Sequence, residues 1–181
     1  MNLIESFQNL VAQVPELVQP LIVALAGAVP FIEGEGAASI GIIGGINPVI
    51  AAVSGIVGNF LCVAVLVLLS SGARKAIVTR RDRSRELVTA GGTSSLEGEA
   101  PIEGSGRKAA RRDKFQRAFE RYGVPGVSLL GPLLLPTHFT ATMLAASGVS
   151  KARVLIWQAV AIVGWTTVLT VIISGAVYAI R

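Results

Sequence analysis

The sequence predicts an all-α polytopic membrane protein: an inverted repeat of a re-entrant hairpin plus a transmembrane helix, preceded by an N-terminal amphipathic helix. Three observations predict this fold class. Hydrophobic residues make up 52% of the 181 residues and charged residues only 15%, against about 25% charged in typical soluble domains. Residues 71–122 hold 13 of the 16 Lys and Arg, and the apolar blocks on either side share one order of parts.

The N-terminal part, residues 1–16, is predicted to be an amphipathic helix that lies in the membrane interface. Its apolar residues recur at three- and four-residue steps, as such a helix requires: Leu3, Ile4, Phe7, Leu10, Val11 and Val14. A frayed tail is the alternative.

Residues 17–71 form the first predicted membrane repeat. The apolar stretch Leu17–Pro30 is shorter than the roughly 20 residues that a spanning helix needs. A helix-breaking polar segment, Pro30–Gly36, separates it from a second short stretch, Ala37–Ile46. Two short arms around a break predict a re-entrant hairpin or a discontinuous helix. Val49–Ser70 follows without a charge and, at about 33 Å as a helix, is long enough to span.

Residues 72–118 are predicted to be a basic cytoplasmic loop with a flexible linker at 88–106, which is rich in small, polar and acidic residues. Basic residues between apolar blocks are typical of a loop on the cytoplasmic side, so we expect 72–121 to face the cytoplasm. Stacking aromatics do not alternate with the basic residues, which argues against nucleic acid as a partner.

Residues 119–181 repeat the order of the first half: a short arm at Tyr122–Leu135, a break at Pro136–Thr140, a second arm at Ala141–Val149 and a long uncharged stretch at Val154–Ile180. Pro30 and Pro136 are 106 residues apart. At the same spacing, the triplet Ile-Val-Gly that starts at Ile56 is repeated at Ile162.

Charge orients the two halves. The basic loop fixes the C-terminal end of the first spanning helix in the cytoplasm, so the first hairpin enters from the outer face and the second from the cytoplasmic face. This inverted repeat is common in secondary transporters and brings the broken segments together near the bilayer midplane.

Two acidic residues and one histidine are the candidate transport and proton-coupling residues. An ionised carboxylate in hydrocarbon costs roughly 2.5 kcal/mol or more, so Glu33 and Glu35 are expected to face a cavity, where either one binds a proton or a cation. His138, the only histidine, shares the second break with Thr137 and Thr140 and is suited to accept a proton. The alternatives are glutamates solvated at the membrane surface and an interfacial histidine.

Other residues have expected structural or lipid-binding roles. The breaks are assigned to prolines and glycines, which interrupt helices: Pro30, Gly34, Gly36, Pro132 and Pro136. Three basic residues at the cytoplasmic face are candidates for binding phosphate headgroups: Arg121, Lys151 and Arg153.

Several catalytic motifs are missing from the sequence. It has no Gly-rich phosphate loop with Lys-Ser/Thr, no His-Glu-x-x-His and no serine beside a candidate base. Cys62 is the only cysteine, which excludes a disulfide framework. We therefore expect no enzyme activity, no cofactor and no metal site.

The segment Pro30-Phe31-Ile32-Glu33-Gly34-Glu35-Gly36-Ala37, with Gly58-Asn59, resembles the bacterial small multidrug export family. Tyr122-Gly123 and Pro132 to Thr137 resemble its second conserved block, so the resemblance covers roughly 17–70 and 119–181. The family is similar to the DedA superfamily, whose paired re-entrant hairpins are linked to lipid-carrier transport and proton-coupled physiology. The resemblance matches Glu33 to the motif's glutamate, whereas Glu35 stands where the pattern has arginine.

The sequence thus predicts a secondary transporter or exporter in the cytoplasmic (inner) membrane, with a site between two proline-broken segments and a proton as the candidate coupling ion. A lipid or lipid-carrier flippase or scramblase is the first alternative, and a non-transporting adaptor that acts through residues 72–121 is the second. Expected partners are membrane lipids and a small-molecule or lipid substrate. A homodimer is also expected, because a single chain is too small to enclose a substrate path.

Overall fold

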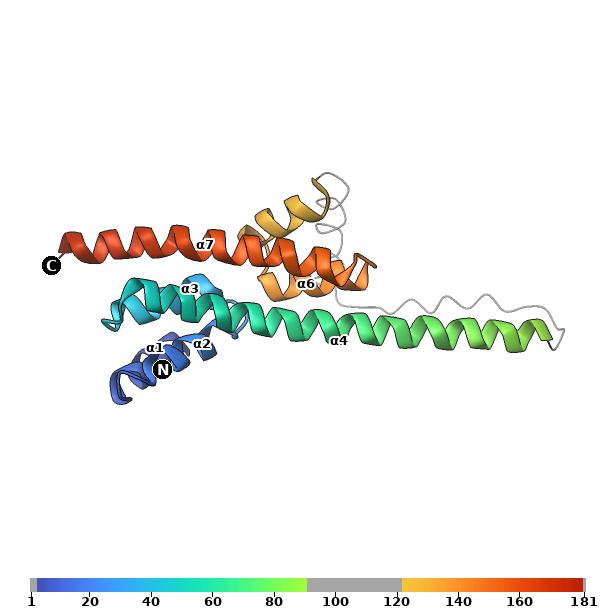
Figure 1. The fold of residues 1–181 in the computed structure, drawn as a ribbon, viewed down its shortest axis with the longest axis horizontal. Helices are drawn as coiled ribbons and strands as arrows, with labels where there is room; N and C mark the ends of the chain where they lie inside the picture. The colour runs from blue at the N-terminus through green and yellow to red at the C-terminus, as the bar shows by residue number, and fades with distance from the viewer. Residues whose placement is uncertain (1–2, 91–121, 181) are drawn as a thin grey trace.

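The computed structural model describes residues 3–90 and 122–180, with side chains described for 3–72 and 122–180. These residues form helices and turns without any strand (Figure 1), so the all-α prediction is confirmed for them. Most of the predicted linker 88–106, the rest of the predicted basic loop to residue 118, and Arg121 lie outside the described residues.

The N-terminal helix α1 (Leu3–Gln13) is observed where the amphipathic pattern predicts a helix. Val11 is fully buried and Phe7 packs on the same apolar cluster, so one edge of the helix rests on α2 and α3. Leu3, Ile4 and Leu10 stay exposed. Its position in a membrane interface stays a prediction.

A turn at 28–32 separates α2 (Gln19–Gly27) from α3 (Glu33–Ile43). Pro30 lies in this turn because its ring removes the amide that would continue a helix. The predicted break at 30–36 is therefore placed too late, and Gly34 and Gly36 are helical. The helix starts at Glu33 because acidic side chains are stabilised in the first turn, where the amides and the helix dipole are positive.

The longest of the described helices is α4 (Pro48–Ala90), which runs without interruption from the predicted spanning segment into the predicted basic loop. The side-chain oxygen of Asn47 accepts a hydrogen bond of 2.9 Å from the Val49 amide, which caps the start of the helix. A Cβ added at Gly55 would lie 2.6 Å from the Gly34 carbonyl oxygen, and one at Gly58 would collide with the Ala24 backbone. These two glycines let α3 and α2 approach α4 closely.

The C-terminal half repeats this arrangement. Residues 122–130 are helical and are followed by the short 3-10 helix η1 (Gly131–Leu133) and then by α6 (Thr137–Ala146) and α7 (Lys151–Ile180). The break at 131–136 contains Pro132 and Pro136. The predicted break at 136–140 is again too late, because Pro136 fits just before the first turn of a helix and Thr137 begins α6.

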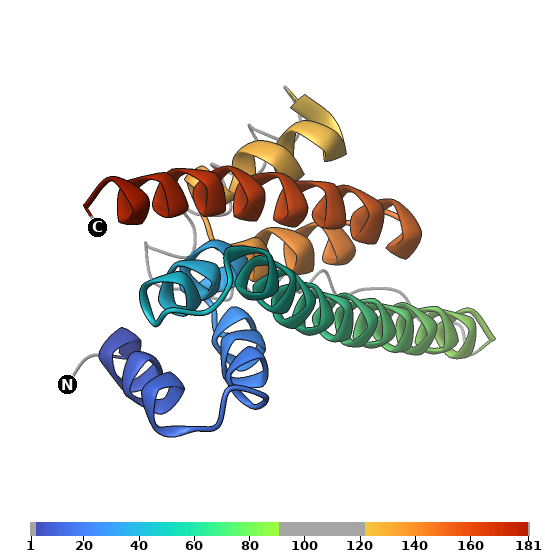
Figure 2. The same cartoon turned by 60° about the vertical axis from the view of Figure 1, so that its left-hand side comes forward.

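The helices α4 and α7 run side by side in opposite directions, so the C-terminal part of α4 and the start of α7 lie at the same end (Figure 1). Both α3 and α6 pack on α4 and on α7. Figure 2 shows α1 and α2 on one side of this pair and the 122–130 helix on the other. The two short-helix pairs therefore approach the centre from opposite ends.

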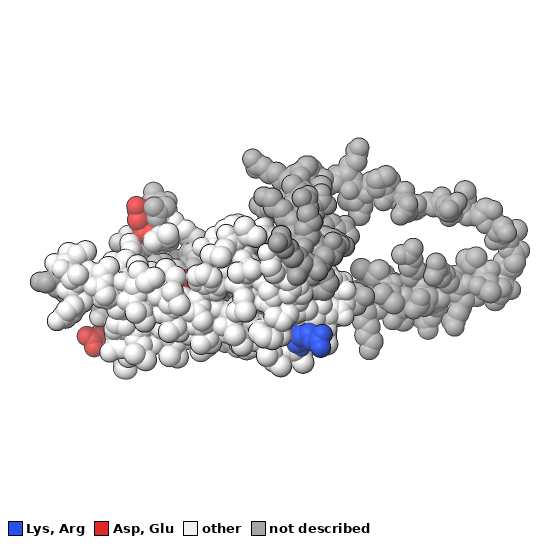
Figure 3. All heavy atoms as spheres, turned by 90° about the horizontal axis from the view of Figure 1, so that it is seen from above, with Lys and Arg blue, Asp and Glu red and all other residues white. Residues whose placement is uncertain are grey.

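Among the described residues, two helices are long and apolar enough to cross a membrane, Pro48–Gly72 within α4 and Lys151–Ile180. Only 28% and 17% of their most apolar windows are buried inside the protein, so neither is the enclosed core helix of a globular fold. In Figure 3 most of the visible acidic atoms lie toward one end of the described molecule and the basic atoms toward the other.

Candidate functional site

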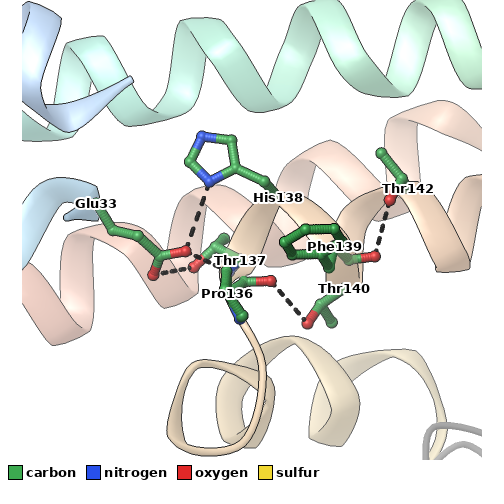
Figure 4. A network of polar contacts seen from close by, with 7 residues as sticks. All are labelled: Glu33, Pro136, Thr137, His138, Phe139, Thr140 and Thr142. Atoms are coloured by element: carbon green, nitrogen blue, oxygen red, sulfur yellow. Dashed lines mark hydrogen bonds and ion pairs between the residues drawn. The ribbon is translucent and has the colours of Figure 1, made fainter. Parts of the chain in front are cut away.

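The two breaks meet at the carboxylate of Glu33. This carboxylate accepts one hydrogen bond from the backbone amide of Thr137 and a second, of 2.8 Å, from the Thr137 hydroxyl (Figure 4). Glu33 is only 6% exposed and Thr137 only 1%. Because these residues begin α3 and α6, the contact joins the first turn of one half to the first turn of the other.

The start of α6 compensates the buried charge of Glu33. The first amides of a helix have no partner within it and carry the positive end of its dipole. Thr137 directs one of these amides at the carboxylate. Helix N-termini bind anions in this way. The α6 amide therefore replaces part of the hydration that the Glu33 carboxylate loses on burial.

His138 adds a titratable partner to this contact. Its Nδ1 lies 3.5 Å from Oε1 of Glu33, which is ion-pair distance but long for a hydrogen bond. The imidazole is 2% exposed, and neither ring nitrogen has a hydrogen-bond partner among the described residues. The imidazole and the carboxylate therefore form a buried pair where the two halves meet.

Glu35 faces the same region but differs from Glu33. Its Oε2 is buried and has no hydrogen-bond partner in the described part of the chain. The structure thus separates two glutamates that the sequence ranks equally, because only Glu33 bridges the halves.

A pocket of about 420 Å³ lies between the breaks, within the range of small-molecule sites. It is lined by residues of both breaks, of the first turn of α3 and by one residue of α7: Phe31, Ile32, Glu33, Glu35, Gly36, Pro132, Leu133, Leu134, Leu135, Pro136 and Leu169. Beside it, the rings of Phe31 and Phe139 pair with centroids 6.2 Å apart. Most of the lining side chains are apolar, and the charged residues among them are Glu33 and Glu35.

The backbone of the first break is strained next to this pocket. Phe31 and Glu33 have φ of 74° and 56°, the left-handed region that is unfavourable for residues with a side chain. Such conformations cost of order 1–3 kcal/mol each and persist where the surroundings over-determine them. At Glu33 the surroundings are the hydrogen bonds to Thr137, which fix the direction of the carboxylate.

The other predicted site residues take supporting or distant positions. The Thr140 hydroxyl donates to the Pro136 carbonyl oxygen at 3.4 Å, so it steadies the start of α6 without reaching Glu33. Pro30 shapes the first break and does not line the pocket. Lys151 and Arg153 are exposed at the start of α7, away from the pocket lining.

Three buried polar residues of α4 and α7 were not marked as site residues by the sequence: Asn59, Gln158 and Thr166. Each is fully buried, and their side-chain polar atoms lack hydrogen-bond partners among the described residues. A Cβ at Gly34 would collide with the Thr166 hydroxyl, which places Thr166 beside the first turn of α3. The sequence signal that could have marked these residues is their position in uncharged helices. Polar groups in such segments are costly unless they face water or a partner.

Comparisons of the chain with protein-family models, with curated proteins and with solved structures give no match. The resemblance to the small multidrug export family therefore stays a prediction.

Proposed function

We propose that the protein is a proton-coupled secondary transporter of the cytoplasmic membrane, with its substrate site in the pocket between the two breaks. The observation that carries the proposal is the contact of Glu33 with Thr137 and His138 at the edge of that pocket. It joins a titratable group, a proton acceptor and the two half-structures at one place.

A membrane location is supported by apolar stripes on the outer helix faces. Val53, Val57, Leu61 and Val65 follow one another at four-residue steps along α4, and each is between 46% and 59% exposed. Monomeric soluble proteins rarely expose a continuous apolar surface of this kind. Lipid would cover it at no hydrophobic cost.

The proposed topology is an inverted repeat. The short helices α2 and α3 enter from the outer face, and the 122–130 helix and α6 enter from the cytoplasmic face. None of the four reaches the roughly 20 residues needed to span, and both pairs end near Glu33 and Thr137. Inverted repeats with central broken helices support alternating access in secondary transporters.

Protonation of Glu33 would switch the contact between the halves. The ionised carboxylate accepts both Thr137 hydrogen bonds and holds the breaks together. When the proton binds, the charge that attracts the α6 amide is lost and these bonds weaken, so the breaks can separate and the pocket can open toward the other side. Passing the proton to His138 restores the charged carboxylate and the closed contact.

The pocket chemistry favours a small uncharged or cationic substrate over a phosphate lipid. Both charged residues in the described lining are glutamates, which repel a phosphate in a medium of low dielectric constant. The basic residues suited to headgroups, Lys151 and Arg153, are at the start of α7 instead. A flippase or scramblase is therefore the weaker candidate.

The test is transport in liposomes with an imposed pH gradient. Ethidium serves as the probe for a cationic substrate and fluorescent phosphatidylglycerol as the probe for a lipid. We expect gradient-driven ethidium movement that falls at least tenfold in Glu33→Gln and is unchanged in Glu16→Gln, a glutamate exposed outside the pocket. No ethidium movement, normal movement in Glu33→Gln, or rapid lipid exchange would each contradict the proposal.

A further inference from the structure

We infer that three hydroxyls on α7, those of Thr166, Thr170 and Ser174, form a water-filled path for protons from the outer end of the protein to the Glu33 pocket. The inference rests on the proposed proton coupling and adds the side from which the proton arrives.

The path begins at a second pocket, of about 230 Å³, at the end where α3 finishes and α4 begins. Its lining includes Ile42, Asn47, Ser174 and Tyr178. Asn47 and Tyr178 are exposed, so this pocket adjoins the surface. In the proposed topology this end faces the outside.

The path ends beside the first turn of α3. Thr166 is fully buried, and a Cβ at Gly34 would collide with its hydroxyl. Gly34 follows Glu33 directly, and Leu169 of the same helix lines the pocket that contains Glu33 and Glu35. Leu169 and Ser174 are five residues apart, so the two pockets meet α7 at points about 8 Å apart along its axis, at about 1.5 Å per residue.

The helices α3 and α7 run parallel over this distance. Gly34 lies beside Thr166, and Ile42 and Ser174 line the same outer pocket, so eight residues of each helix separate the two contacts. Thr170 is midway on α7 and Ala38 is midway on α3. Gly34 has no side chain and Ala38 has only a methyl group, so α3 presents little side-chain volume to these hydroxyls.

These hydroxyls differ from several others in the described helices, although the buried Ser128 hydroxyl shares their lack of a partner. A Ser or Thr in an apolar helix usually donates back to a carbonyl of the preceding turn. Ser39, Ser70, Ser71 and Ser147 do so, at 2.6–2.8 Å. Thr166, Thr170 and Ser174 have buried hydroxyl oxygens with no hydrogen-bond partner among the described residues.

A buried hydroxyl without a partner is unfavourable, and three in succession along one helix face require another source of hydrogen bonds. Water supplies it where a cavity is polar and connected. A file of water and hydroxyls also carries protons, so the same feature that satisfies these groups would connect Glu33 to the outside.

The test is cysteine accessibility in the full-length protein with Cys62→Ala, which removes the only thiol of the native chain. Thr170→Cys and Ser174→Cys in intact cells are exposed to a membrane-impermeant cationic methanethiosulfonate. The matched controls are Val171→Cys and Ile172→Cys, which lie at the same depth on the outward apolar face. We expect the two path positions to react at least tenfold faster than the controls.

Equal rates at path and control positions, or no reaction at Thr170→Cys, would overturn the inference. A second measurement uses the native cysteine background: Thr170→Val should slow gradient-driven proton movement at least fivefold, and Thr167→Val, on the exposed side of α7, should not. Labelling requires no transport. Reactive path positions without pH-driven transport would therefore refute the proposed function alone, and Glu33-dependent transport with unreactive path positions would refute the path alone.

Discussion

The hydroxyl of Thr137 donates a 2.8 Å hydrogen bond to the carboxylate of Glu33 across 104 residues of sequence. The same carboxylate accepts the Thr137 backbone amide. One side chain therefore closes the gap between the first turns of two helices that belong to different halves of the chain. A contact of this kind can hold the halves together in one protonation state and release them in the other.

Thr137→Val removes the hydroxyl donor and keeps the backbone donor. A hydrogen bond to a charged group contributes about 1.5–3 kcal/mol, so we expect the free energy of unfolding to fall by about that amount. Reversible denaturation in mixed micelles measures it. Thr142→Val is the control, because its exposed hydroxyl bonds only the nearby Phe139 carbonyl and should cost under about 0.5 kcal/mol. Equal losses in the two variants would show that the bond to Glu33 contributes no more to the free energy of unfolding than the exposed bond of Thr142.

Glu33 and His138 should behave as one unit in transport. Their closest atoms are 3.5 Å apart, and residues that exchange a proton show non-additive effects when both are removed. We expect Glu33→Gln with His138→Gln to transport no more slowly than the poorer single variant. The test compares the rates of pH-driven transport of the native protein, the two single variants and the double variant. If the two losses multiply, the residues act independently.

The sequence named Glu33, Thr137 and His138 as candidates, and the structure brings these three together, but the sequence could not choose between Glu33 and Glu35. Residues two apart on a helix point about 200° apart, so Glu33 and Glu35 face different neighbours once the rotation of α3 is set. Gly34 sets that rotation, since it packs against α4 and α7 where a side chain would collide. That choice depends on long-range packing, which the local pattern does not encode.

The repeat was predicted from its order of parts, and the order is observed, but the spacing differs. Pro30 and Pro136 are 106 residues apart, whereas the first residues of α3 and α6 are 104 apart. Pro30 lies inside a longer turn, and Pro136 lies directly before its helix. A proline fixes where a helix cannot continue, and the capping contacts decide where the next one starts.

The orientation of the two halves is testable at both ends of the long helices. Asn47 and Lys151 are both exposed; Asn47 directly precedes α4 and Lys151 is the first residue of α7, at opposite ends of the molecule. In a Cys62→Ala protein, we expect Asn47→Cys to react with an impermeant maleimide in intact cells. Lys151→Cys should react only after permeabilisation. Labelling of both from one side would contradict two spanning helices, and the reversed pattern would contradict the proposed direction.

Gly58 and Gly164 offer a direct test of how the halves differ. They occupy the same position in the matching triplets that begin at Ile56 and Ile162, yet their surroundings are unlike. A Cβ at Gly58 would collide with the Ala24 backbone, and one at Gly164 would meet nothing within 4 Å.

Gly58→Ala forces α2 away from α4, and overpacking of this kind costs about 1–3 kcal/mol. Gly164→Ala instead removes a flexible residue from a helix interior and should stabilise the protein by about 0.4–1 kcal/mol. Thermal unfolding in the same detergent would compare the two variants with the native chain. A loss in both would mean that the outer face of α7 is packed in the native protein, as it would be in the expected homodimer; a loss in neither would mean that α2 does not approach α4 at Ala24.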